Sequence, residues 1–306
     1  MAISVSEIFT AAISPLGARI NQLPPIVLVF GGPLGDPNKS AREMFNTWAA
    51  LKHPTIGSQI RTPEEFDDWN SFTGYGNLVD FEIDAGNLAR AIVLFSESPG
   101  SFAELGAFCA NSALAERLFV VVAKEHYQAI SFIAYGPLKK IEDLKHDHSI
   151  CVLDSLDPTK IQDQLPDVFT ALEEKLGTLP KTLTFQPLRH RDQFLLIADL
   201  VDLFGALTER ELHGLVQTMG ADIDYPALGR ITSQLLRFEL VAHVPGVTKR
   251  FFVAPVKRLS YLNYASPKDL PAFDRARFKL VKAMPWLMAD KLRHDAYCQI
   301  HTKALT

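Results

Sequence analysis

One carboxylate, Glu104, stands three residues past the Ser-Pro-Gly-Ser turn in the stretch LFSESPGSFAELGAF, residues 94–108. A carboxylate at such a turn can attack the sugar carbon of a glycosidic bond, or stabilise the positive charge that develops there. It can equally cap a helix, because Ser101 and Glu104 have the S-x-x-E spacing of a capping box. Capping boxes are common and catalytic carboxylates are rare, so residue types alone favour the cap.

The setting of the turn favours the catalytic interpretation. The apolar run AIVLF at 91–95 predicts a buried strand directly before it, and α/β proteins bind ligands at the carboxyl ends of such strands. Gly100 lets backbone N–H groups point at an anion near the helix start. Ser98 and Ser101 could bind sugar hydroxyls or phosphate, although either could only cap the helix. Gly106 is expected to let other groups approach closely behind the glutamate.

A second glycine-rich turn, VFGGPLGD at 29–36, follows the first predicted strand and should lie beside the first turn. Gly31 and Gly32 are therefore candidate substrate-binding residues. The turn is not G-x-G-x-x-G and lacks the Lys-Ser/Thr of a P-loop, so it predicts neither a dinucleotide nor a triphosphate site. Taken alone, an ordinary tight turn explains it equally well.

Cleavage of a glycosidic bond also needs a group that protonates or holds the leaving base. The acidic cluster Asp80, Glu82 and Asp84, just before the strand at 91–95, is the nearest candidate source. Asp80 is better explained as the solvated start of a helix. Asp84 is a candidate substrate-binding residue, and the general acid itself stays unassigned.

The elements around these turns predict an α/β fold with a doubly wound parallel sheet. Short β-branched apolar runs are typical of strands that are covered on both faces. Strands are expected at 25–30, 91–95, 117–123 and 149–153, and helices at 40–51, at 84–90, over SFAELGAFCANSALAE and at a position ending near Gly177. Strand, turn, helix and strand within about thirty residues form a βαβ unit.

From about residue 188 the pattern changes to that of a winged helix-turn-helix domain. RDQFLLIADLVDLFG predicts a helix that ends at Gly205, and Thr208 with Glu211 forms a capping box for the next. DYPALGRITSQLLRFEL predicts a third helix, and AHVPGVTKRFFVAP predicts a hairpin. We therefore expect two domains, 1–180 and 188–306.

Charge differs between the two halves. Residues 1–180 carry 13 Lys and Arg against 23 Asp and Glu, a net −10, and residues 181–306 carry 18 against 12, a net +6. A basic second half is compatible with a polyanionic partner. Four basic residues lie on the third helix and in the hairpin and are candidates for binding nucleic acid or a partner: Arg230, Arg237, Lys249 and Arg250. Winged helices also dock proteins, so duplex binding is not compelled.

The composition and the cysteine pattern disfavour disordered, membrane-spanning, disulfide-stabilised and metal-binding proteins. Apolar residues make up 47% and charged residues 22%, an ordinary globular balance, and no apolar run is long enough to cross a bilayer. The three cysteines are widely spaced and odd in number, and KHDH at 145–148 lacks further ligands nearby, so no disulfide framework or metal site is expected. We expect a cytoplasmic protein and an oligomer.

The stretch FSESPGSFAELGAF resembles the nucleoside deoxyribosyltransferase family, in which the glutamate of an E-[LI]-G motif attacks the anomeric carbon. Together with SFIAYGPLKKI at 131–141, it resembles more closely the retron-associated effector proteins, in which a deoxyribosyltransferase-like domain precedes a winged-helix domain. Tyr135, with Gly136 and Pro137, is expected in a rigid turn at a strand end. This tyrosine could stack on a base, although a packed turn residue is the commoner case.

The resemblance implies an anti-phage toxin that cleaves the N-glycosidic bond of NAD or a related nucleotide, with Glu104 as its catalytic residue. NAD would be a substrate, and no cofactor is implied. The implied partner is the retron reverse transcriptase with its msDNA, the branched RNA–DNA product, which would restrain the toxin until infection. Two alternatives stay open: a nucleotide-sensing DNA-binding transcriptional regulator, and a salvage nucleoside deoxyribosyltransferase.

Overall fold

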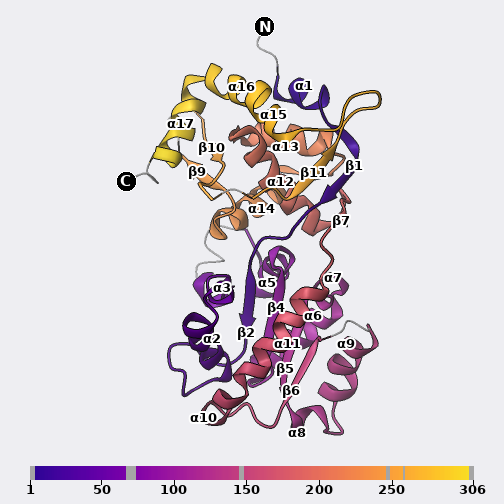
Figure 1. Cartoon of the computed structure of the whole chain (residues 1–306), viewed down its shortest axis with the longest axis vertical. Coiled ribbons are helices and arrows are strands. Elements are labelled where there is room, and N and C mark those ends of the chain that lie inside the picture. Colours follow the sequence, from indigo (N-terminus) through magenta and orange to yellow (C-terminus); the bar gives the residue numbers. More distant parts are fainter. Residues whose placement is uncertain (1–3, 67–73, 145–147, 246–248, 258, 303–306) are drawn as a thin grey trace. The chain divides into compact units, whose positions relative to one another are not determined.

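A computed structural model of the chain contains two compact units (Figure 1). The α/β unit comprises Pro25–Asn70 and Gly76–Pro180, and the helical unit comprises Met1–Pro24, Ser71–Tyr75 and Lys181–Thr306. The structure describes residues 4–66, 74–144, 148–245, 249–257 and 259–302.

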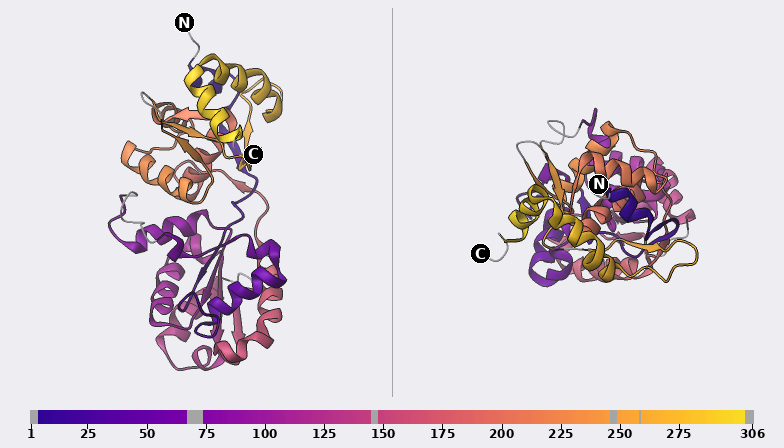
Figure 2. Two further views of the ribbon diagram at one scale, coloured as in Figure 1. Left: turned by 90° about the vertical axis from the view of Figure 1, so that its left-hand side faces the viewer. Right: turned by 90° about the horizontal axis from the view of Figure 1, so that it is seen from above.

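A five-stranded parallel sheet forms the centre of the α/β unit. Its order is β3-β2-β4-β5-β6, with every neighbouring pair parallel. The strands are β2 (Val27–Phe30), β3 (Ile60–Arg61), β4 (Ala91–Phe95), β5 (Leu118–Ala123) and β6 (Ile150–Leu153). Every residue of β2, β4 and β5 is buried, because helices cover both faces (Figure 2). The parallel sheet of an α/β fold is confirmed, and β3 is an addition that the sequence did not reveal.

The helices of the α/β unit divide between the two faces of the sheet. On one face α2 (Ala41–Lys52) and α11 (Leu165–Thr178) meet where the rings of Phe45 and Phe169 stack at 4.5 Å. On the other face α6 (Pro99–Ala110) places Phe108 against Phe30 of β2, with ring centroids 4.9 Å apart. Short elements complete the unit: α3 (Pro54–Gly57), η1 (Pro63–Phe66), α7 (Ser112–Ala115), α8 (Lys124–Tyr127), η2 (Ala134–Leu138), α9 (Lys139–Asp143), α10 (Pro158–Ile161) and η3 (Gln162–Gln164).

The helix expected at 84–90 is displaced. It is α5 (Leu78–Leu88), and it begins two residues before Asp80 because Asn77 caps it by accepting the Asp80 N–H. The acidic cluster therefore lies inside a helix rather than before it. Since α5 leads directly into β4, its first turns lie toward the far, carboxyl end of that strand.

Three helices and a small sheet form the part of the helical unit that the sequence predicts as a winged helix-turn-helix. The helices are α12 (His190–Phe204), α13 (Glu209–Thr218) and α14 (Tyr225–Arg237). Both bonds of the Thr208–Glu211 capping box are present, and Gly205 ends α12 with a φ of 82°. The antiparallel sheet has the order β8-β10-β9, from β8 (Ala206–Thr208), β9 (Ala242–Val244) and β10 (Phe251–Val253). The Pro-Gly turn of the expected hairpin extends outside the described residues.

The N-terminal segment, expected from the sequence to be part of the first domain, belongs to the helical unit. After α1 (Val5–Thr10), strand β1 (Ser14–Ile20) pairs antiparallel with both β7 (Leu183–Thr184) and β11 (Leu262–Ala265). Phe9 is fully buried against Tyr264, with ring centroids 5.9 Å apart. These contacts are remote in sequence, so no local pattern indicates them.

The C-terminal segment packs on the same unit as α15 (Arg275–Phe278), η4 (Lys279–Ala283), α16 (Met284–Ala289) and α17 (Lys291–Thr302). Ion pairs fasten it to α12 and α13. Arg275 and Lys279 both contact Asp202, at 2.9 Å and 2.6 Å. In α17, Arg293 donates to both carboxylate oxygens of Glu211, at 2.7 Å and 2.9 Å, and its guanidinium lies 3.7 Å from the Trp286 ring centroid.

Replacing Arg293 by Ala should lower the free energy of unfolding of the helical unit by about 3 kcal/mol, because Glu211 would lose its partner at a largely buried site. Burial raises the pKa of Glu211, but hydrogen bonds from Arg293 and from the Thr208 backbone outweigh it and lower this pKa overall. The stabilisation is therefore present above the unfolded pKa and is lost as pH falls through the folded value.

Urea unfolding of the wild type and of Arg293→Ala at neutral and acidic pH measures both effects. Lys249→Ala is the control, since its ion pair with Asp290 is half exposed at 3.4 Å and should contribute less than about 1 kcal/mol. Equal losses for the two variants would contradict the prediction.

Candidate active site

The two predicted turns meet at the point where the strand order of the sheet reverses. β3 lies on one side of β2 and β4 on the other, so the chain leaves β2 and β4 in opposite directions along the sheet. In open α/β sheets ligands bind outside the carboxyl ends of the strands at such a switch point. Hydrogen bonds join the turns here: the Ser98 hydroxyl donates to the Gly31 carbonyl at 3.3 Å.

Glu104 does not cap helix α6. The N-cap is Ser98, whose hydroxyl accepts the Ser101 N–H at 3.1 Å, while the Ser101 hydroxyl accepts the Ser98 N–H at 2.9 Å. These two serines form the whole capping box. Because the helix starts at Pro99, Glu104 is its sixth residue and lies beyond the first turn. The capping interpretation of Glu104 is wrong.

The carboxylate of Glu104 is held in an environment that disfavours its charge. Its Oε2 is buried and accepts no hydrogen bond from the described residues. Burial is the main cause that raises the pKa of Glu104 to about 7; Arg42 lowers this pKa and the nearby charge of Glu64 raises it. The group is therefore near half-ionisation at neutral pH.

A second carboxylate with a raised pKa faces the first. Glu82 on α5 is 7% exposed, and burial, followed by the negative charges of Glu104 and Glu64, raises its pKa to about 8. Burial thus disfavours the charged form of both groups, and the charge of Glu104 disfavours that of Glu82 further. Two interacting carboxyl groups of which one is protonated can serve as acid and as anionic partner in one site.

The other acids of the cluster have different surroundings. Asp80 is exposed and accepts a hydrogen bond from the Asn77 side chain at 2.9 Å, as expected for a helix start. Asp84 is buried, with 8% exposed, and its contact with a substrate stays a prediction. The sequence could not single out Glu82, because the choice depends on which face of α5 turns inward.

Sequence reasoning missed Glu97, which is the second residue after the end of β4. Its carboxylate accepts the backbone N–H groups of Gly32 at 2.7 Å, Ala41 at 2.6 Å and Arg42 at 3.0 Å. The N–H of Gly32 is thus already bonded within the protein, and contact of Gly31 and Gly32 with a substrate stays a prediction. The sequence signal that could have identified Glu97 is a glutamate shortly after one predicted strand, in a turn expected to lie beside the glycine turn of another.

Three further expectations can be compared with the structure. Gly100 is exposed at the start of α6. At Gly106 no atom lies within 4 Å of the position a Cβ would occupy, so the expected close approach is absent. Tyr135 lies in the π-helical turn η2 and not at a strand end, and it is 67% exposed. Stacking of Tyr135 on a base stays a prediction.

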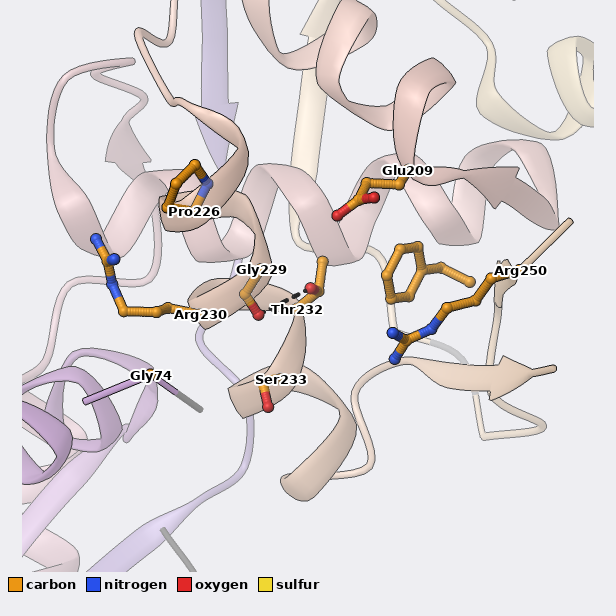
Figure 3. A pocket seen from close by; sticks show the side chains of 9 residues that line it. Gly74, Glu209, Pro226, Gly229, Arg230, Thr232, Ser233 and Arg250 are labelled. Atoms are coloured by element: carbon orange, nitrogen blue, oxygen red, sulfur yellow. Dashed lines mark hydrogen bonds between the residues drawn. The ribbon is translucent and has the colours of Figure 1, made fainter. Parts of the chain in front are cut away.

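Two of the four basic residues named from the sequence line one hollow of about 410 Å³ in the helical unit. Arg230 of α14 and Arg250, next to β10, approach it from opposite sides, with Ser233 between them (Figure 3). Arg250 lies 5.3 Å from the Phe252 ring centroid. Lys249 instead pairs with Asp290, and Arg237 ends α14 outside the lining.

Metal and membrane features are not found in the described ranges. No group of three His, Cys, Asp or Glu side chains there could hold a metal ion. Of KHDH, only His148 is described, and its Nδ1 lies 2.9 Å from Glu174. None of the described helices has the length and apolar character that crossing a bilayer requires.

The Glu82 environment predicts an unusual pH dependence of stability. The folded pKa lies above the unfolded value of about 4.3, so stability falls as pH rises between these values. Glu82→Gln cannot ionise and should match the wild type near pH 4, but exceed its free energy of unfolding by roughly 2–4 kcal/mol at pH 9. Urea unfolding across this range tests it, with Asp80→Asn, exposed on the same helix, as control. A constant difference at all pH values would contradict the assigned burial.

Comparison with known proteins places these features in a family. The family model described as "STM3845 retron effector protein" matches residues 38–243, which is more than half of the chain. This match includes Glu82, Glu97 and Glu104 of the α/β unit and the three helices α12 to α14.

Two curated proteins of Escherichia coli are similar over shorter stretches. "Retron Ec86 putative ribosyltransferase/DNA-binding protein" is 40% identical over 78 residues, 25% of this chain and 25% of that protein. "Retron Ec73 putative ribosyltransferase/DNA-binding protein" is 28% identical over 153 residues, 46% and 48% of the two chains. The match thus spans from a quarter to about half of the curated relatives' length. On the strength of the family match, the chain belongs to the STM3845 retron effector family.

Proposed function

We propose that the α/β unit cleaves the N-glycosidic bond of NAD or a related nucleotide. The observation that carries this proposal is the pair Glu82 and Glu104, whose pKa values are raised to about 8 and about 7 at the switch point of the sheet. Burying two carboxyl groups together opposes folding. A site that only senses a nucleotide has no need of them, whereas glycosidic cleavage uses one carboxylate as nucleophile and, for a neutral nucleoside, a second carboxyl group as acid.

The chemistry follows from the two protonation states. The ionised Glu104 carboxylate attacks C1′ of the sugar as the C1′–N bond breaks, and a glycosyl ester forms. Protonated Glu82 supplies a proton to a leaving base that requires one. Water, deprotonated by the resulting Glu82 carboxylate, then hydrolyses the ester and restores both groups. With NAD the nicotinamide leaves neutral without taking a proton, so Glu82 stays protonated, and the proton of the water that hydrolyses the ester is released to solvent. Glu82 therefore matters as an acid chiefly for neutral nucleosides.

We propose further that the protein is a toxic effector of a retron anti-phage defence system. Family membership and the words "ribosyltransferase/DNA-binding" in the relatives' names support this. The three helices and antiparallel sheet of the helical unit have the order of a winged helix-turn-helix. In this proposal the unit docks the reverse transcriptase and its msDNA, and the complex restrains the enzyme.

Glu104→Gln is expected to lower glycosidic cleavage by at least about 10³-fold, because the amide cannot form the ester. The melting temperature should not fall, since Glu104 takes no part in the capping box and its buried charge opposes folding. Mass spectrometry of NAD and deoxynucleosides incubated with purified protein measures the products, with exposed Glu116→Gln as the control.

Near-normal turnover by a folded Glu104→Gln protein would remove Glu104 from the mechanism. Base exchange between deoxynucleosides in the same assay would point to the salvage transferase instead of a hydrolase. Glu82→Gln, run in parallel, should impair cleavage of neutral deoxynucleosides more than cleavage of NAD.

The double variant Arg230→Ala, Arg250→Ala should weaken association with the reverse transcriptase–msDNA complex. Each lost phosphate contact should also reduce the slope of log binding constant against log salt concentration by about one unit for duplex DNA. Cells that express the partner should then suffer more toxicity from the variant than from the wild type.

Lys249→Ala is the matched control, because its ammonium already pairs with Asp290. Unchanged affinity and salt slope in the double variant, even after Arg237→Ala and Lys249→Ala are added, would show that the unit docks through other surfaces.

A further inference from the structure

Three backbone N–H groups converge on one carboxylate at the carboxyl edge of the sheet. One belongs to Gly32, in the turn after β2, and two belong to Ala41 and Arg42, the first residues of the 12-residue helix α2. All three donate to Glu97, over 2.6–3.0 Å. Glycine turns that lead into helix N-termini commonly bind the phosphates of ligands in this way. In this protein the side chain of Glu97 occupies the position that such a phosphate would take.

The glycines of the turn fit this carboxylate. A Cβ at Gly31 would lie 2.8 Å from Glu97 Oε1, and a Cβ at Gly32 would lie 3.0 Å from the same atom. The start of α2 is equally close: Arg42 Cβ would lie 2.9 Å from the Gly31 position, and Ser40 Cβ 2.7 Å from the Gly32 position. The two glycines therefore permit the close approach of both Glu97 and the start of α2, which explains them without a bound ligand.

We call the N–H groups of Gly32, Ala41 and Arg42 the phosphate cradle. The charges around it leave little attraction for a second anion. The α2 N-terminus favours one negative charge, and Glu97 supplies it. The guanidinium of Arg42, on the same helix start, donates from both terminal nitrogens to Glu64, at 2.7 Å and 3.1 Å. A phosphate brought to this edge would meet the Glu97 carboxylate and find its donors taken.

We propose that Glu97 is a specificity-determining residue: it fills the phosphate cradle with the protein's own charge and so requires an uncharged group of the substrate at this edge. Glu97 is partly exposed, so its carboxylate can accept a hydrogen bond from a sugar hydroxyl. The phosphates of a nucleotide must then lie away from α2. The cradle stands on geometry alone, and only the identity of the substrate rests on the proposed function.

The test compares thermal unfolding in inorganic phosphate and in sodium chloride of equal ionic strength. The wild type should melt at the same temperature in both. Glu97→Ala frees three N–H donors, and phosphate should raise its melting temperature by about 5 °C. Glu43→Gln, which removes a charge from the first turn of α2 without emptying the cradle, should behave as the wild type. A Glu97→Ala protein that folds only in phosphate would also support the proposal.

Phosphate-specific stabilisation of the wild type, or none in a folded Glu97→Ala protein, would overturn the proposal. If Glu97→Ala does not fold in either salt, Glu97→Gln keeps the size of the side chain, removes the charge and leaves part of the cradle without an acceptor, because its amide NH2 cannot accept an N–H. For this variant the KM of a nucleoside 5′-phosphate should fall about tenfold relative to that of the unphosphorylated nucleoside, and an unchanged ratio would overturn the proposal. Absence of turnover in the wild type would count against the proposed function, while the melting comparison would still decide the role of Glu97.

Discussion

The arrangement of the α/β unit at its carboxyl edge depends on the hydrogen bonds of Glu97. This residue follows β4 by two positions and directly precedes the N-cap of α6, yet its side chain binds the turn after β2 and the start of α2. It thereby links β2 to β4 at the point where the strand order of the sheet reverses. Together with the Ser98–Gly31 hydrogen bond and the capping box of α6, this side chain holds the turn from which Glu104 projects.

The pair of carboxyl groups beyond that turn opposes the stability of the same unit. Glu82 and Glu104 sit on helices that pack on a sheet whose central strands are fully buried. Burial raises both pKa values, and the charge of Glu104 adds to the effect on Glu82. Such a site persists because the remainder of the core is large and apolar, and strain of this kind is typical of functional positions.

The sequence predicted the elements that carry a local pattern. Buried apolar runs located β4 at Ala91–Phe95, and the capping residues Thr208 and Gly205 located the ends of helices. Glu104 was found through its turn and its family resemblance. Glu82 was not separated from Asp80 and Asp84, because the choice depends on which acids α5 buries and on the charges of Glu104 and Glu64 near Glu82, and these contacts are remote in sequence. Glu97 and the pairing of β1 were missed, since each depends on contacts across tens or hundreds of residues.

Strand β1 has a consequence for how the chain is made. It is the middle strand of the sheet β11-β1-β7, so both of its edges are completed only by residues near 183 and 262. The α/β unit is in effect an insertion within the other unit, and it can fold on the ribosome while β1 is still unpaired. A fusion placed before β1 would accordingly disturb the late-forming unit, whereas the inserted unit would already be complete.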